Sequence, residues 1–159
     1  MNLKINFLGS PNFEVVRNRP LKYIIIHYTG MKNQKDAIKR LQSKVAKVSC
    51  HYIISKKGKI FQLVKDKHVA WHAGKSKWKK DINLNINSLG IELVNKGHEI
   101  FPKSQINSLI LLLKWLRRKY NINPAMILGH EDISPNRKKD PGPRFPWYVL
   151  KKNNLAKKR

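Results

Sequence analysis

The segment at residues 127–147, ILGHEDISPNRKKDPGPRFPW, gathers side chains that can do chemistry. It contains His130, Glu131, Asp132 and Asp140, so three of the nine acidic residues of the chain lie close to one histidine. Imidazole and carboxylate groups bind zinc, and they also act as general acids and bases. Several prolines stiffen the segment, so a rigid loop could bring Asp140 back toward His130 at a small cost in conformational entropy.

A second histidine stands in a similar position. His27 ends the apolar run III at residues 24–26, and His130 ends the run MIL; each lies where a predicted strand meets a loop. Such strand ends are where α/β folds assemble their sites. The two strands could be neighbours in one sheet. Taken singly, each of the six histidines is more often structural than functional, so the hypothesis rests on their combination.

Three protein ligands with a fourth position open for water are typical of catalytic zinc. His27, His130 and Asp140 could form such a set. Glu131 and Asp132 are the alternative carboxylates. They lie so close to His130 in sequence that they cannot easily converge with it, and they could instead form a helical turn or cap. Spacing alone leaves this choice open.

A further acid and a lysine could complete a hydrolytic site. Glu92 lies in LGIELVN with apolar residues on both sides, where burial of a carboxylate is costly unless it is paired or functional. One reading turns Glu92 to solvent in an alternating strand; the other makes it the general base beside a metal-bound water. Lys138, two residues before Asp140, would then lie near the metal and stabilise an oxyanion.

The pattern of apolar residues predicts alternating strands and helices. The expected strands cover residues 22–29, 49–55, 59–64, 88–95 and 125–130, the middle pair forming a hairpin around Gly58. The expected helices cover residues 33–47 and 104–120, with a short helical turn after Pro146. In the first helix, the predicted buried stripe consists of Ala37, Ile38, Leu41 and Val45.

These elements predict an α/β fold: a single domain, residues 1–159, with a central mixed β-sheet flanked by helices. The core is expected at about residues 9–148, followed by a basic C-terminal tail at 149–159. Residues 1–20, which contain two prolines, are expected to be irregular.

The formal charge of +25 would attract polyanions, but lysine-rich composition alone also explains it, and no nucleic-acid-binding motif accompanies it. We therefore expect no specific nucleic-acid partner. Cys50 is the single cysteine, which excludes an internal disulfide. No apolar run is long enough to cross a membrane, and the N-terminus lacks the features of a signal peptide. The expected location is the cytoplasm, with action in the periplasm left open.

Five motifs occur in an order that resembles a known family: YIIIHYTG, VSCHYIISKKGKIFQLV, VAWHAG, NSLGIELVN and LGHEDISPNRKKDPGPRFPW. Over residues 9–148 the chain is similar to zinc-dependent N-acetylmuramoyl-L-alanine amidases of the amidase-2 type, most of all their AmpD/AmiD-like branch. The resemblance implies hydrolysis of the amide bond between N-acetylmuramic acid and L-alanine in peptidoglycan or muropeptides, by a protein that we expect to be a monomer.

The resemblance also implies roles for individual residues. His27, His130 and Asp140 would hold one zinc ion, with Glu92 as the acid/base residue and Lys138 as the stabiliser of the transition state. Phage and animal relatives often have cysteine as the third ligand, and phage relatives carry a catalytic tyrosine where this chain has Cys50. The bacterial branch shares the aspartate and lacks the tyrosine.

Substrate contacts are less sharply marked. In the family, the AWHAG segment usually lines the substrate-binding groove. Trp71 and His72 are therefore candidates for contact with sugar or peptide, with packing as the alternative for Trp71. Asn95 and Trp78 are weaker candidates of the same kind. The alternative function is a peptidoglycan-binding module without activity, although such modules usually lose a metal ligand. The sequence leaves open whether the substrate is a 1,6-anhydro-muropeptide or the intact wall.

Overall fold

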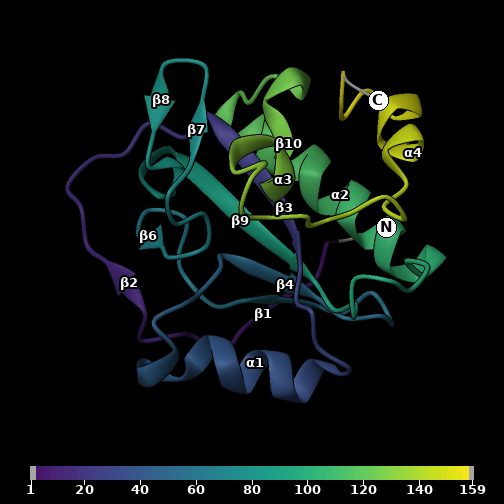
Figure 1. The fold of residues 1–159 in the computed structure, drawn as a ribbon, viewed down its shortest axis with the longest axis horizontal. Helices are drawn as coiled ribbons and strands as arrows, with labels where there is room; N and C mark the ends of the chain where they lie inside the picture. Colours follow the sequence, from purple (N-terminus) through teal and green to yellow (C-terminus); the bar gives the residue numbers. More distant parts are fainter. Residues whose placement is uncertain (1–2, 158–159) are drawn as a thin grey trace.

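A six-stranded mixed sheet forms the centre of the computed structural model, which describes residues 3–157 (Figure 1). The strands lie in the order β1 (Ile5–Phe7), β5 (Ile60–Gln62), β4 (Tyr52–Ile54), β9 (Ser88–Leu93), β3 (Tyr23–Tyr28) and β10 (Ile127–Gly129). All neighbours run parallel except β4 and β5, which form the predicted antiparallel hairpin. The predicted α/β fold with a central mixed sheet is confirmed.

Helices cover both faces of the sheet (Figure 1). The long helix α2 (Lys103–Tyr120) and the short α4 (Trp147–Lys152) pack on one face, where their leucines meet Ile24 and Ile26 of β3. The helix α1 (Gln34–Gln42) packs on the other face, against Ile53 and other residues of a separate apolar cluster. Because side chains alternate along a strand, Ile25 and His27 face away from α2.

The remaining elements are short. Two ribbons lie beside the main sheet, and a one-turn helix follows β10. They are β2 (Phe13–Glu14) paired with β6 (Val69–Ala70), β7 (Lys77–Trp78) paired with β8 (Asp81–Ile82), the helix α3 (His130–Ile133), and the 3-10 turns Lys44–Ala46, Leu84–Asn87 and Pro124–Met126. None of the helices within residues 3–157 combines the length and the apolar character needed to cross a membrane.

Several expectations were wrong in detail. Residues 1–20 are not wholly irregular, because β1 extends the edge of the main sheet and β2 pairs with β6. Val45 is not part of the buried stripe: α1 ends at Gln42, and Val45 sits in a separate 3-10 turn, 91% exposed. The strand expected at 125–130 begins only at Ile127, after a 3-10 turn, and His130 opens α3.

The C-terminal residues belong to the core. Leu150 and Leu155 are fully buried, and Ala156 is 5% exposed, in the same apolar cluster as α2. The expected tail at 149–159 therefore contributes packing, as far as the described residues reach. Its lysines lie on the outer side of α4, where both Lys151 and Lys152 are exposed.

The turn of the β4–β5 hairpin depends on Gly58. It has a φ of +79° and lies so close to α2 that an added Cβ would be 2.6 Å from Ser108 Oγ and 2.7 Å from the Ser104 carbonyl oxygen. Gly9 has a similar φ of +74°, but an added Cβ there would find no atom nearer than 3.7 Å.

The pair of glycines separates backbone strain from steric clash. Gly9→Ala should lower the free energy of unfolding by about 1–2 kcal/mol through left-handed strain alone. Gly58→Ala should cost about 1–3 kcal/mol more, because the hairpin must move away from α2. Urea denaturation of both variants measures the difference, and equal losses would contradict the close hairpin–helix contact.

Candidate metal and catalytic site

Parallel strand pairing brings the candidate residues together. His27 is paired in register with Glu92 on β9, and Gly129 at the end of β10 is paired with Ile26, so His130 comes next to His27. Residues that share a register position on parallel strands point to the same face of the sheet. The expectation that the strands ending at His27 and His130 are neighbours is confirmed.

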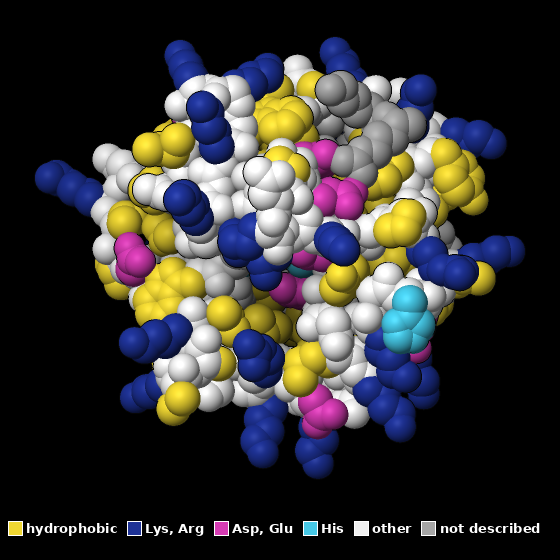
Figure 2. Space-filling view, in the orientation of Figure 1, with side chains coloured by type: hydrophobic (Ala, Val, Ile, Leu, Met, Phe, Trp, Pro, Cys, Tyr) yellow, Lys and Arg dark blue, Asp and Glu magenta, His cyan; other side chains and the backbone are white. Residues whose placement is uncertain are grey.

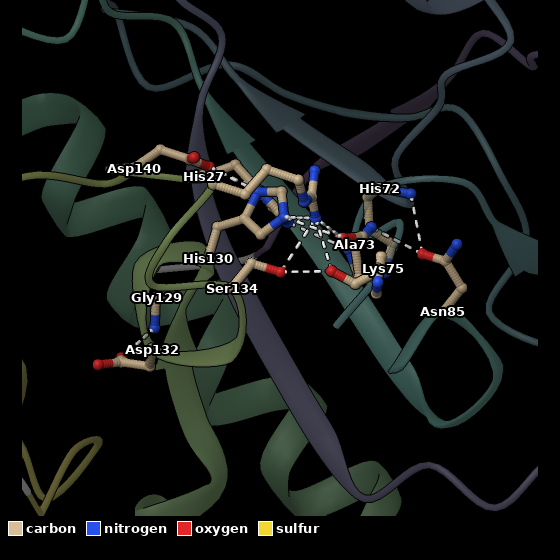
Figure 3. A network of polar contacts seen from close by, with 11 residues as sticks. His27, His72, Ala73, Lys75, Asn85, Gly129, His130, Asp132, Ser134 and Asp140 are labelled. Carbon is tan, nitrogen blue, oxygen red and sulfur yellow. Dashed lines mark hydrogen bonds and ion pairs between the residues drawn. The ribbon is translucent and has the colours of Figure 1, made fainter. Parts of the chain in front are cut away.

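Three buried ligand atoms converge at the ends of these strands. His27 Nδ1 lies 2.8 Å from Asp140 Oδ2 and 3.0 Å from His130 Nδ1, and His130 Nδ1 lies 3.1 Å from the same Asp140 oxygen. The three residues form a group that could hold a metal ion. Figure 3 shows their side chains pointing toward one another. In a tetrahedral zinc site, ligand atoms about 2.0 Å from the metal are roughly 3.3 Å apart, so the spacing fits.

The protonation of the cluster also fits a cation. His130 Nε2 lies 3.0 Å from the Ala73 carbonyl oxygen, which can only accept a hydrogen bond, so Nε2 is the donor in this contact and Nδ1 is the ring nitrogen available to a metal. Burial lowers the pKa of His27 to about 4, which keeps its imidazole neutral at pH 7. Burial opposes the ionisation of Asp140, but the adjacent histidines hold the pKa of its carboxyl below the usual value. These are the forms that bind metals.

Asp140 reaches the histidines through a loop that is closed by hydrogen bonds. The backbone N–H of Glu131 donates to the Asp140 carbonyl at 2.9 Å, and the N–H groups of Arg137 and Lys138 both donate to the Ser134 carbonyl. The side chain of Asp132 turns away and accepts from the Gly129 N–H at 2.8 Å, so it caps α3 as one alternative had predicted.

Glu92 lies beside this cluster, on the wall of a cavity that opens over it. Its Oε2 atom is out of contact with solvent and has no hydrogen-bond partner among the described residues. Burial, followed by the charge of Asp140, raises the pKa of Glu92 to about 8, while Lys138 lowers it. Glu92 is half-buried and lines the cavity, so its side chain faces the candidate site and not the outer surface of the sheet. A carboxyl with a pKa close to the working pH can both take and give a proton.

A cavity of about 460 Å³ opens over these groups. Its wall includes His27, Glu92, His130, Lys138 and Asp140, together with two of the expected substrate contacts, Trp71 and His72. Trp71 Nε1 donates to Glu14 Oε1 at 3.0 Å, which holds the indole on the rim. Figure 2 shows Lys and Arg side chains spread around the face that contains the site, with acidic side chains near its centre.

Two expected substrate contacts lie elsewhere. Asn95 is fully buried: its amide donates to the Glu99 carbonyl at 3.1 Å and accepts from the Gly97 N–H at 2.7 Å. Its side chain therefore shapes a turn after β9 and does not reach the cavity. Trp78 packs against the apolar cluster around Ile25 and Ile133.

The sequence-based reasoning missed Arg137. Its guanidinium lines the cavity and donates to the Ala73 and Lys75 carbonyls at 2.7 and 2.9 Å, which ties the loop before Asp140 to the AWHAG segment. Arg40 and Lys139 add further positive charge to the wall. Proximity to Lys138 was the only available signal for Arg137 and Lys139; nothing in the sequence pointed to Arg40.

His51 lies next to the candidate site and packs against His72. Its Nδ1 accepts from the Gly90 N–H, and its Nε2 lies 3.0 Å from the His68 carbonyl, so the neutral ring carries its proton on Nε2. The ring packs edge to face on His72, with centroids 5.7 Å apart. Burial, followed by the charge of Arg19, lowers the pKa of His51 to about 3.

Comparison with known proteins identifies the family to which the chain is similar. Residues 17–143 match the Amidase_2 family, described as N-acetylmuramoyl-L-alanine amidase. The chain is 37% identical over 152 residues to the N-acetylmuramoyl-L-alanine amidase AmiD of Escherichia coli K12, covering 86% of this chain and 54% of that protein. It is 39% identical over 102 residues to the 1,6-anhydro-N-acetylmuramyl-L-alanine amidase AmpD of Haemophilus influenzae, covering 64% and 55%.

A solved structure agrees with the match. The complex of E. coli AmiD with the substrate anhydro-N-acetylmuramic acid-L-Ala-D-gamma-Glu-L-Lys superposes with a TM-score of 0.82 at 36% identity, covering 87% of this chain and 59% of that one. The chain spans about half the length of the curated relatives it matches.

Acid should destabilise the protein through His51. Its folded pKa of about 3 lies below the unfolded value of 6.5, so the unfolded chain binds the extra proton between these values. The contribution of neutral His51 is complete above pH 6.5 and is lost as the pH falls toward 3. Between pH 6 and 4 the free energy of unfolding of the wild type should fall by about 1.4 kcal/mol per pH unit more than that of His51→Gln.

Urea denaturation of both proteins at each pH gives this difference. Above pH 7 the gap between wild type and variant should be constant, which serves as the internal control. A gap that also stays constant down to pH 4 would mean that His51 titrates normally in the folded protein.

Proposed function

The chain belongs to the Amidase_2 family, and from this premise we propose that it is a zinc-dependent N-acetylmuramoyl-L-alanine amidase. It would hydrolyse the amide bond between N-acetylmuramic acid and L-alanine in peptidoglycan or muropeptides, during turnover, recycling or lysis of the cell wall. The observation that carries the proposal is the convergence of His27, His130 and Asp140 on the wall of a cavity that Glu92 also borders.

Zinc is the metal that suits the donors. Two imidazole nitrogens and one carboxylate oxygen make a three-ligand set, and zinc held there would supply Lewis acidity to a water molecule and to the substrate carbonyl. The chain provides only three ligand side chains in this group, within the described residues, and the cavity lies over them. A catalytic site needs such an open side, whereas a structural zinc site is closed by four protein ligands.

Glu92 and Lys138 would move the protons and stabilise the charge. Glu92 would accept a proton from the water that attacks the lactyl carbonyl carbon, and it would deliver this proton to the nitrogen of the departing L-alanine. Lys138 would place its positive charge beside the carbonyl oxygen as that oxygen becomes negative. The C–N bond breaks, and no covalent intermediate with the protein is required.

The basic wall of the cavity suits an acidic peptide. A stem peptide in which D-glutamate is linked through its γ-carboxyl keeps a free α-carboxylate. Arg40, Arg137 and Lys139 on the cavity wall could pair with such groups. The E. coli AmiD ligand, anhydro-N-acetylmuramic acid-L-Ala-D-gamma-Glu-L-Lys, has this chemistry, and we extend that class of substrate to this chain. We further propose that one chain holds one zinc ion and acts as a monomer.

Glu92→Gln keeps the size of the side chain but removes its ability to accept a proton. We expect kcat to fall by about 10²–10⁴-fold, with Zn²⁺ still bound. The matched control is Glu131→Gln, a carboxylate next to His130 that does not line the cavity, and it should retain activity within a few-fold. Release of the free L-alanine amine from an anhydro-muropeptide measures both. Full activity of Glu92→Gln would remove Glu92 from the reaction.

Metal content should separate the competing acids. Asp140→Ala should lose Zn²⁺ and activity, while Glu131→Ala should keep both, because only Asp140 faces the two histidines. Zinc per chain after dialysis, measured by inductively coupled plasma mass spectrometry, gives the first readout. Chelation of the wild type should abolish hydrolysis, and added Zn²⁺ should restore it. Undiminished hydrolysis by the chelated protein would contradict a zinc mechanism.

A further inference from the structure

His72 lies between a candidate metal ligand and the backbone of the sheet. His72 Nδ1 is 3.1 Å from His27 Nε2, and His72 Nε2 is 3.2 Å from Ser88 Oγ. The Ser88 hydroxyl in turn donates to the Leu84 carbonyl. The contacts form an unbroken chain from His27 to a backbone oxygen, and Figure 3 shows His72 next to His27.

The carbonyl at the end of this chain fixes the direction of every bond in it. A carbonyl can only accept, so the single hydroxyl proton of Ser88 is used on Leu84 and its Oγ is left to accept from His72 Nε2–H. His72 Nδ1 is then bare and accepts from His27 Nε2–H. A neutral imidazole with its proton on Nε2 has a free lone pair on Nδ1, and in His27 this is the atom that faces His130 and Asp140.

We propose that His72 is a positioning residue, which sets the tautomer and the ring orientation of His27 by relaying the direction imposed by the Leu84 carbonyl through Ser88. The inference rests on the proposed zinc function, since the role of His72 is to present His27 Nδ1 to the metal. Histidine ligands of metals usually donate their second nitrogen to such a partner, which keeps the ring oriented and raises its basicity.

The sheet is built to hold His72 in this place. Ser88, Gly90 and Glu92 alternate along β9 and so share one face. A Cβ on Gly90 would lie 2.4 Å from His72 Cγ, so the imidazole rests directly on the strand where a side chain is missing. Any larger residue at position 90 would displace the ring from His27.

The backbone around His72 is fixed as well. Asn85 Oδ1 accepts from the N–H groups of His72 and Ala73 at 3.0 and 2.7 Å (Figure 3). The Ala73 carbonyl accepts from His130 Nε2. His72 and Ala73 therefore contact the Nε2 atoms of the two candidate metal ligands, His27 and His130. The side chain of Asn85 in turn fixes the backbone of His72 and Ala73.

Two substitutions at position 72 distinguish positioning from packing. Asparagine places its Oδ1 near the position of the His72 Nδ1 atom, so His72→Asn keeps an acceptor for His27 Nε2–H. Leucine fills similar space without an acceptor. The Zn²⁺ dissociation constants of the wild type, His72→Asn and His72→Leu are measured by competition with a chromogenic chelator, and thermal unfolding of the metal-free proteins is measured in parallel.

We expect His72→Leu to bind Zn²⁺ about 10–100-fold more weakly than the wild type, and His72→Asn to recover most of this loss. Equal Zn²⁺ affinity of the leucine and asparagine variants would overturn the inference, since packing alone would then account for His72. A wild type that binds no Zn²⁺ would overturn the proposed function and this inference together, whereas tight wild-type binding with equal variants overturns the inference alone.

A measurement on the wild type avoids any question about the folding of the variants. In the Zn²⁺-loaded protein, ¹⁵N-detected NMR of the imidazoles should find the His27 proton on Nε2, with a scalar coupling across the hydrogen bond to His72 Nδ1. A His27 ring that carries its proton on Nδ1 would overturn the proposal.

Discussion

The site depends on one electrostatic constraint: three atoms with lone pairs, His27 Nδ1, His130 Nδ1 and Asp140 Oδ2, lie within 3.1 Å of one another in a buried position. Hydrogen bonds at the far side of the rings place the imidazole protons away from this point, most directly where His130 donates to the Ala73 carbonyl. Such a group of lone pairs is the donor arrangement that a metal cation needs. The strands and the loop around the site hold these three atoms close together.

Parallel pairing of three adjacent strands brings the candidate residues together. β3 lies between β9 and β10, so one strand end presents His27 while its neighbours present Glu92 and lead into His130. The apolar residues of α2 pack the opposite face, so the polar groups at these strand ends lie on the face that points away from α2. On that face, β9 presents the hydroxyl of Ser88, the missing side chain of Gly90 and the carboxyl of Glu92. The same strand therefore supports His72 and provides the candidate base. The unpartnered Oε2 of Glu92 costs stability that the core beneath must offset.

Much of this could be predicted from the sequence, and the reasons differ between residues. The strands β3 and β9 and the helix α2 are long and strongly patterned, so their apolar periodicity marks them. Strands of two or three residues, such as β1 and β6, have no periodicity to detect, and Val45 was misassigned because the helical pattern continues past the end of α1. Spacing alone left the choice among Asp140, Glu131 and Asp132 open; the family resemblance favoured Asp140, and the loop hydrogen bonds show how it reaches the histidines. The link from His72 to Ser88 needed coordinates, because it joins residues 16 positions apart.

The most direct test of the account is a crystal structure of the Zn²⁺-loaded protein with anomalous data collected on both sides of the zinc absorption edge. The account predicts one anomalous peak about 2.0–2.2 Å from His27 Nδ1, His130 Nδ1 and an Asp140 carboxylate oxygen, with the cavity on its open side. A peak bound through Nε2 of either histidine, or zinc held elsewhere while these three residues keep their contacts with one another, would contradict it.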